Sequence, residues 1–207
     1  MTEVSINKQA RLSEHFSLGE LTKSRHTEIY NIPSHVAIEN LKRVCSWLEA
    51  LRLRYNQRYV CGSFSPPELG GVRGGLNKGM SGASSDHPTH TGTPPRSALP
   101  LCSAKNLGGE IDTEEPIVIS SGYRSPELNK KVGGSPTSNH LTGCAVDIRV
   151  YGIEQAMRYA VILMDYADET KQDYDEILIE RNSNGGYWLH FAVRPKDNRR
   201  KTMFLQK

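Results

Sequence analysis

The sequence predicts an α+β fold, in which helices pack on one face of a small and mostly antiparallel sheet. Two observations carry this prediction. Apolar residues recur at mostly helical spacing in residues 34–55 and 152–167, whereas shorter segments in the second half of the chain alternate apolar and polar residues, as strands do. These segments follow one another as helix, helix, strand, strand, helix and hairpin, which is an order typical of an α+β domain.

Two shorter helical segments, residues 17–20 and 125–131, are predicted in addition to the two long helices. Residues 17–20 read Ser-Leu-Gly-Glu, which has the form of a capping box and predicts a short helix at this point. The first long helix begins near Pro33 and runs to about Tyr55, and residues 125–131 are expected to form a helical turn.

Four strands are predicted, at residues 117–120, 144–150, 176–180 and 187–193. Residues 182–186 read Asn-Ser-Asn-Gly-Gly, which is turn chemistry, so the last two strands should pair as a hairpin. The basic segment 194–207 shows no such pattern, and we interpret it as a solvated C-terminus.

A region of different composition interrupts this order at about residues 60–115. It holds more than half of the glycines and prolines of the chain and shows no apolar periodicity. A segment of this length without regular structure is uncommon inside a compact domain and is usually functional or disordered. We therefore predict a single domain over residues 1–207, interrupted by a flexible Gly/Pro-rich insertion at 60–115.

Charge and composition exclude several classes of protein. The formal net charge is +3 and the sequence pI is about 8.6, and the lysines and arginines are scattered rather than gathered in one run. This mild charge does not indicate nucleic-acid binding. No apolar run approaches the roughly 20 residues that cross a bilayer, so no membrane insertion is expected. The four cysteines form no Cys-x-x-Cys pair, which argues against a cysteine zinc site.

Side-chain alternation places three polar residues on one face of the predicted sheet. In the last three predicted strands the apolar residues take one face, and Asp147, Glu180 and His190 take the other. His140 lies just before the first of these strands, where a loop can bring its imidazole beside Asp147. Two histidines and one carboxylate are a familiar ligand set of catalytic zinc, which leaves a coordination position for water. The sheet face opposite the helices is therefore predicted to carry a metal site.

A longer motif surrounds these residues. Residues 138–147 read SNHLTGCAVD and match the pattern Ser-x-His-x-x-Gly-x-Ala-x-Asp, and a Trp-x-His follows at residues 188–190. Together with SGYRS at residues 121–125 and HFSLGEL at residues 15–21, this motif resembles the zinc D-alanyl-D-alanine carboxypeptidase family. The family includes D,D-dipeptidases and phage endolysins that cut L-alanyl-D-glutamate bonds. The chain is most similar to the short forms found in phages and prophages.

The resemblance implies a role for each motif residue. The ligands of one zinc ion would be His140, Asp147 and His190. Arg124 would bind a substrate carboxylate or the carbonyl oxygen under attack, which agrees with the two hydrogen bonds that a guanidinium can give. Ser138 would contact the substrate or brace the His140 loop, and Trp188 would contribute to substrate binding. Gly143 would allow the close turn between the first two ligands.

The general base is the point at which the chain departs from the family. Many members carry Glu or Asp three positions before the last histidine, but this chain has Tyr187 there, which strand alternation turns away from the site. The short phage-like forms instead have a glutamate at the end of the preceding strand. Glu180 occupies that place and is our candidate base, with Glu176 in reserve. The alternative interpretation of Arg124 and Glu180 is that both are solvated surface groups, as ionised side chains usually are.

The resemblance implies a zinc-dependent peptidase that cuts the peptidoglycan stem, of either the D-Ala-D-Ala carboxypeptidase or the L-Ala-D-Glu endopeptidase type. The alternative is a non-catalytic metal-binding module on the same fold, used for cell-wall attachment or protein contact, because Tyr187 occupies the usual carboxylate position. The expected partner is bacterial peptidoglycan or its peptides, and a monomer is expected. The first residues lack the apolar core of a signal peptide, so we expect synthesis in the cytoplasm and action on the cell wall after release.

Overall fold

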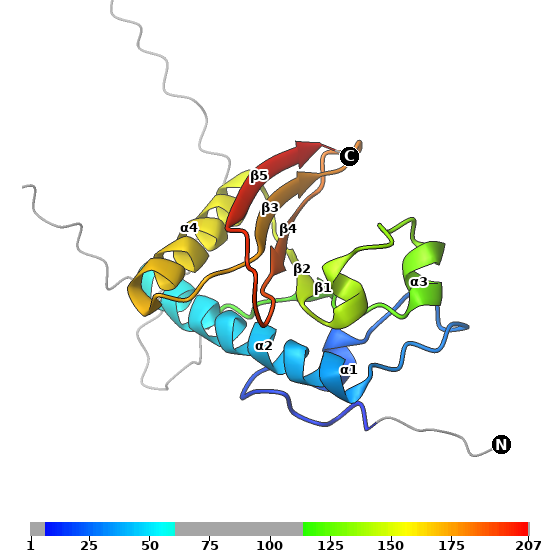
Figure 1. Ribbon diagram of the computed structural model, residues 1–207. Helices are drawn as coiled ribbons and strands as arrows, with labels where there is room; N and C mark the ends of the chain where they lie inside the picture. The colour runs from blue at the N-terminus through cyan, green and yellow to red at the C-terminus, as the bar shows by residue number, and fades with distance from the viewer. Residues whose placement is uncertain (1–6, 61–113, 207) are drawn as a thin grey trace, which may run out of the picture. The chain divides into compact units, whose positions relative to one another are not determined.

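The computed structural model describes residues 7–60 and 114–206 of the chain, and Figure 1 shows their arrangement. The helices are α1 (Leu18–Leu21), α2 (His35–Tyr55), α3 (Pro126–Lys131) and α4 (Ile153–Thr170). The strands are β1 (Ile119–Ser121), β2 (Ala145–Arg149), β3 (Glu176–Arg181), β4 (Tyr187–Ala192) and β5 (Lys201–Gln206). A π-helical turn, Asn56–Val60, extends α2, and a short 3-10 helix, Asn139–Thr142, precedes β2. These elements confirm the predicted α+β class.

The first three helices begin at serines whose side chains cap them. Ser17 accepts a hydrogen bond from the backbone N–H of Glu20, whose carboxylate accepts from the N–H of Ser17, so the predicted capping box is confirmed. Ser34 and Ser125 likewise accept from backbone N–H groups of α2 and α3. Such caps satisfy N–H groups that lack a partner inside the helix and contribute about 1 kcal/mol each. None of the helices in the described part of the chain is both long and apolar enough to span a bilayer.

The strands form one sheet in the order β1-β2-β4-β3-β5. β2 and β4 pair antiparallel, with Asp147 directly opposite His190. β4 and β3 also pair antiparallel, as the predicted hairpin, with Leu178 opposite His190. β1 pairs antiparallel with β2, and β5 pairs parallel with β3. This register places the side chains of Asp147 and His190 next to each other on one face of the sheet.

The helices α2 and α4 pack together on one face of the sheet and bury its apolar side chains (Figure 1). The fully buried strand residues of this core include Val146, Ile148, Ile177, Leu189 and Phe191. The ring of Trp47 on α2 packs against that of Phe191, with centroids 5.4 Å apart. Burial of side chains of this size contributes roughly 1.5–3 kcal/mol each. Because strand side chains alternate, the same packing sends Asp147, Glu180 and His190 to the opposite face, as predicted.

The prediction for the C-terminal segment is wrong. Residues 201–206 form β5, an edge strand that pairs parallel with β3, and are not a solvated tail. The strand gives no sequence pattern because both of its faces are partly exposed. Met203 and Phe204, which are neighbours in sequence and point to opposite faces, are 44% and 52% exposed. Without a buried face there is no selection for alternation between apolar and polar residues.

Two segments that are distant in sequence meet at Asn56. Its side-chain amide donates to the carbonyl oxygen of Glu115 at 3.2 Å, and its side-chain oxygen accepts from the N–H of Glu115 at 2.8 Å. Arg52 also pairs with Glu114 at 2.8 Å. The end of α2 is thus joined directly to the segment that leads into β1. The rest of the predicted insertion, residues 61–113, lies outside the described residues and stays a prediction.

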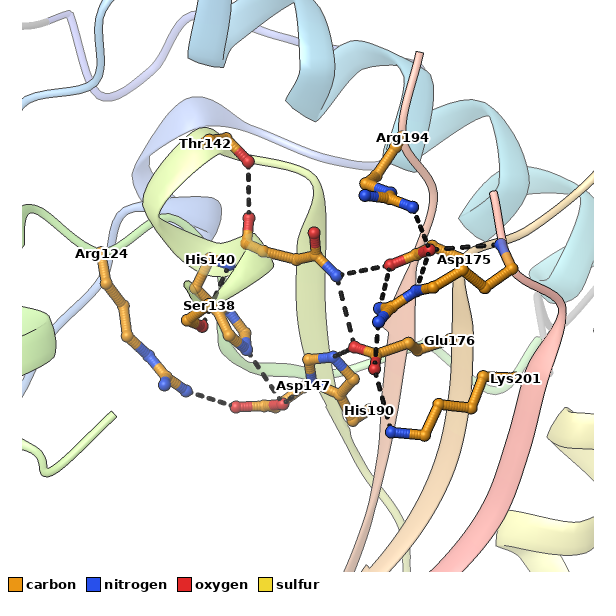
Figure 2. Close-up of polar contacts among 12 residues, drawn as sticks. Arg124, Ser138, His140, Thr142, Asp147, Asp175, Glu176, His190, Arg194 and Lys201 are labelled. Carbon is orange, nitrogen blue, oxygen red and sulfur yellow. Dashed lines mark hydrogen bonds and ion pairs between the residues drawn. The ribbon is translucent and has the colours of Figure 1, made fainter. Parts of the chain in front are cut away.

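A fully buried carboxylate, Asp175, ties the segment before β5 to the sheet (Figure 2). Arg199 donates to it from Nε at 2.8 Å and from Nη2 at 2.7 Å, and a nitrogen of Arg194 lies 2.9 Å away. Asn139, on the 3-10 helix, donates to the same carboxylate at 2.7 Å. Burial disfavours the charged form, but the hydrogen bonds from Arg199 and Asn139 outweigh it and hold the pKa of Asp175 below its ordinary value.

Removal of this charge should cost stability. Asp175→Asn leaves Arg194 and Arg199 without their common counter-ion, and we expect the free energy of unfolding to fall by about 1–3 kcal/mol. The loss stays below that of a fully buried pair because both arginines reach solvent. The matched control is Asp173→Asn, which removes an exposed partner of Arg200 and should cost less than about 1 kcal/mol. Urea denaturation measures both values, and equal losses would contradict the role of Asp175.

The free energy of unfolding that is lost in Asp175→Asn should also depend on pH. A carboxylate with a lowered folded-state pKa stabilises the protein above its unfolded pKa of about 3.9, and this contribution disappears as the pH falls through the folded value. The difference between wild type and Asp175→Asn is therefore expected to stay constant between about pH 5 and pH 7 and to shrink below about pH 4. A difference that grows on acidification would show that another group provides the stability.

Candidate active site

His140 is carried by the 3-10 helix Asn139–Thr142, at a place where the sequence predicts only a loop. Ser138 caps this helix, and its hydroxyl accepts a hydrogen bond from the N–H of His140 at 3.4 Å. Gly143 ends the helix in the left-handed conformation, with φ +72°. A Cβ atom at Gly143 would lie 2.4 Å from the carbonyl oxygen of Ala37 on α2. Glycine is therefore required here both for the backbone angle and for the close approach to α2.

Hydrogen bonding sets the orientation of the His140 ring. Its Nδ1 lies 2.6 Å from the carbonyl oxygen of Gly122, which can only accept, so Nδ1 carries the proton. Its Nε2 is left to face Oδ1 of Asp147 at 3.3 Å. An imidazole whose outer N–H is held by a backbone carbonyl is the usual arrangement of a metal-binding histidine.

Asp147 lies at the centre of the candidate site (Figure 2). Its Oδ1 is 2.9 Å from Nδ1 of His190, and its Oδ2 accepts a hydrogen bond from Nη2 of Arg124 at 2.6 Å. Burial disfavours the anion, but the adjacent His140 and His190 outweigh it and hold the pKa of Asp147 well below its usual range. The carboxylate is therefore ionised, as a metal ligand must be.

The outer nitrogen of His190 faces a second carboxylate, that of Glu176. Nε2 of His190 lies 3.6 Å from Oε2 of Glu176. Burial opposes protonation of the ring, but the carboxylates of Asp147 and Glu176 raise the pKa of His190 to about 9. The contact with His190, assisted by Arg199 and Lys201 and opposed by burial, lowers the pKa of Glu176 to about 2. This carboxylate therefore stays charged at neutral pH.

The three predicted ligands meet at one point. Each of His140, Asp147 and His190 offers one ligand atom, and these atoms lie within 4.8 Å of one another. Two imidazoles and one carboxylate are a donor set of catalytic zinc sites. The outer nitrogens of both rings face hydrogen-bond acceptors, as they do in established zinc centres. The residues present therefore fit a zinc ion.

These side chains line a pocket with a volume of about 670 Å³. The other predicted site residues that line it are Arg124, Ser138, Glu176, Glu180 and Trp188. Glu180 is 4% exposed and the side chain of Arg124 is 18% exposed, so neither is the solvated surface group of the alternative interpretation. Tyr187 packs against the apolar core, with its ring centroid 6.3 Å from that of Phe204, and so turns away from the site as alternation predicts.

The sequence does not reveal the outer partners of the site. Glu176 contacts Arg199 at 3.0 Å, Lys201 at 3.5 Å and Asn139 at 3.3 Å. The sequence could have indicated Asn139 as a site residue, because it directly precedes His140 in the motif. Nothing in the sequence indicates Arg199 and Lys201 as site residues, since they belong to a segment that has no apolar-polar pattern.

A family model described as Peptidase M15 matches residues 82–172 of the chain. The matched segment ends before β3, and the candidate site residues within it are Arg124, Ser138, His140 and Asp147. No match is found among curated proteins. Glu180 and His190 lie outside the matched segment and join the other residues through the register of β3 and β4. The pocket therefore brings the predicted metal ligand His190, which lies outside the matched segment, together with the matched residues.

Substitutions at two glycines test whether the position of His140 depends on the close contact between its turn and α2. Gly133 and Gly143 have φ values of +71° and +72°, but a Cβ atom at Gly133 would meet nothing within 4 Å. Gly133→Ala should therefore cost only the strain of a left-handed backbone, about 1–2 kcal/mol. Gly143→Ala must also push the turn away from Ala37, so it should cost clearly more and weaken zinc binding about tenfold or more through displacement of His140. Urea denaturation and zinc titration measure both effects, and identical results for the two variants would contradict the close contact.

Proposed function

We propose that this pocket hydrolyses a peptide bond of the peptidoglycan stem with one zinc ion bound. The match of residues 82–172 to the Peptidase M15 family model supports the proposal. The observation that carries the proposal is the meeting of His140, Asp147 and His190 in a pocket that also holds Arg124 and Glu180. When bound, zinc in such a ligand set supplies a Lewis acid that polarises the scissile carbonyl and activates water. The remaining steps belong to the side chains of the protein.

In the proposed reaction, Arg124 would bind the carbonyl oxygen under attack or a substrate carboxylate. Its Nη2 donates to Asp147 at 2.6 Å and its Nε donates to Ser121 at 2.9 Å, which fixes the plane of the guanidinium. A guanidinium has five N–H groups, so these two contacts leave donors for the substrate. A positive charge that is already held in position stabilises the negative charge that develops during attack.

Glu180 is our candidate for the general base. It lies near the end of β3, directly opposite Trp188 in the sheet, and its side chain lines the pocket. From this position it would take a proton from the attacking water and pass it to the leaving amine. Trp188 would offer the stem peptide an apolar surface on the same side of the pocket.

Glu176 is better suited to hold His190 than to move protons. Its Oε1 is engaged by Arg199 and Lys201, and its Oε2 faces His190 and Asn139. A carboxylate behind a metal-binding imidazole orients the ring and raises its basicity. The reserve candidate for the base therefore has a structural role of its own beside His190.

Purified muropeptides test the proposed function. Zinc-loaded wild type is expected to cleave them, and mass analysis identifies the bond. Loss of a terminal D-alanine indicates a carboxypeptidase, whereas a divided stem with a new amine indicates an endopeptidase. His140→Ala should lose both bound zinc and cleavage, while His35→Ala, at an exposed position at the start of α2, should keep both. Absence of cleavage by wild type with zinc bound would overturn the proposal and favour a non-catalytic metal-binding module.

Substitution of the two glutamates of β3 should affect different quantities, kcat for Glu180 and zinc affinity for Glu176. Glu180→Gln is expected to keep zinc and fold but to lose about 10²–10⁴-fold in kcat, which is the contribution of a general base. Glu176→Gln removes the partner of His190, so zinc affinity should fall about 10–100-fold while kcat at saturating zinc changes much less. Zinc titration and steady-state kinetics separate the two effects. Near wild-type kcat in Glu180→Gln would remove it from the mechanism.

A further inference from the structure

Arg124 also forms part of the wall of a second pocket, with a volume of about 440 Å³. Besides Arg124, the basic residues that line this pocket are Lys23, Arg25, His26 and Arg149. None of the described residues in its wall is acidic. The pocket therefore gathers several positive charges next to the candidate active site, and a concave surface of one charge sign concentrates ligands of the opposite sign.

This clustering is unusual for the chain, whose other arginines commonly pair with carboxylates. Arg52, Arg54 and Arg58 pair with Glu114, Glu169 and Asp165, and Arg199 and Arg200 pair with aspartates near β3. Among the described residues, no salt bridge joins Lys23, Arg25 or Arg149 to a carboxylate. The charges of Lys23, Arg25 and Arg149 are thus not neutralised by the described residues and remain available to an anionic ligand. Of the other two basic residues, Arg124 pairs with Asp147 and His26 lies beside Glu28.

The pocket is held in shape by the polar groups that join its two sides. Lys23 and Arg25 belong to the segment after α1, and the side chain of Asn31 fastens this segment to the one that carries Arg124. The Asn31 amide donates to the carbonyl oxygens of Thr22 and Tyr123, both at 2.9 Å, and its oxygen accepts from the N–H of Ser125 at 2.7 Å. A binding site that is already formed loses less entropy when its ligand binds.

Gly122 allows these two segments to lie against each other. A Cβ atom at Gly122 would lie 2.2 Å from the carbonyl oxygen of Leu21, and the N–H of Tyr123 donates to that oxygen at 2.7 Å. The carbonyl oxygen of Gly122 in turn accepts from the ring of His140. The same short segment therefore positions both the basic pocket and the first metal ligand.

The chemistry of the wall defines the ligand. Arginines bind carboxylates through two parallel hydrogen bonds. The apolar residues that complete the wall, Ile119, Leu128 and Val132, would contact a short aliphatic chain. We propose that this pocket is a subsite for a free carboxylate of the peptide substrate and that it selects acidic stem peptides over amidated ones. The proposal rests on the proposed function, because it takes the ligand to be the substrate of the adjacent site.

Two peptides that differ in one group test the subsite. One is the stem tetrapeptide L-Ala-γ-D-Glu-L-Lys-D-Ala with a free α-carboxylate on its glutamyl residue, and the other carries an amide at that carboxylate. Isothermal titration calorimetry of the full chain gives the dissociation constant of each peptide. The metal is removed beforehand so that no peptide is cut. Wild type is expected to bind the acid about tenfold more tightly, the effect of two exposed ion pairs. Added salt should reduce this preference.

Charge removal should abolish the preference without altering the fold. Arg25→Gln combined with Arg149→Gln is expected to bind the acid and the amide within about twofold of each other. Lys23→Gln combined with Arg25→Gln repeats the test without a change in β2. Lys171→Gln, an exposed lysine at the end of α4, is the matched control and should keep the full preference. Equal affinities in wild type, or an unchanged preference in both double variants, overturn the subsite.

Zinc-loaded wild type separates this proposal from the proposed function. Cleavage of both peptides with equal KM would support the peptidase and overturn the subsite. A lower KM for the acid, which is lost in the double variants while kcat is retained, would support both. Binding that depends on the carboxylate, without cleavage, would support the subsite as a peptide-binding site and overturn the peptidase.

Discussion

The buried carboxylate of Asp147 is the group around which the candidate site is organised. It receives Arg124 from the segment after β1, His140 from the 3-10 helix before β2 and His190 from β4. An ionised carboxylate without such partners would cost several kcal/mol in the protein interior. These three segments must therefore be in place together for the charge to be tolerated. The same requirement brings two imidazoles and a carboxylate into the geometry of a metal centre.

The apolar core maintains the register on which this convergence depends. β2 presents Val146 and Ile148 to the helices, and β4 presents Leu189 and Phe191. A shift of one residue in either strand would turn these side chains towards the pocket and would turn Asp147 or His190 into the core. The hydrophobic contacts with α2 and α4 thus specify the polar face indirectly, and no separate interaction is needed to choose which residues of the strands face the substrate.

Local patterns account for the part of the site that the sequence predicts. Alternation with a period of two places Asp147 and His190 on one face, because it depends only on residues within each strand. His140 has no such period and required the motif around it. The pairing of Arg199 with Asp175 was beyond prediction, since it joins residues that are far apart in sequence through a segment without periodicity. Long-range contacts of polar residues leave no local pattern. β5 was missed because neither of its faces is buried, so its sequence does not alternate between apolar and polar residues.

The unpredicted strand β5 also separates the roles of the two glutamates on β3. Parallel pairing sets Lys201 opposite Glu176 and Leu205 opposite Glu180. One glutamate therefore has a cation as its neighbour, with Arg199 beside it, whereas the other has an apolar neighbour at the same edge. Two carboxyl groups in different environments can divide structural and catalytic work between them. In the proposed mechanism, Arg199 and Lys201 hold the first glutamate as an anion behind the predicted ligand His190, and the second glutamate acts on the substrate.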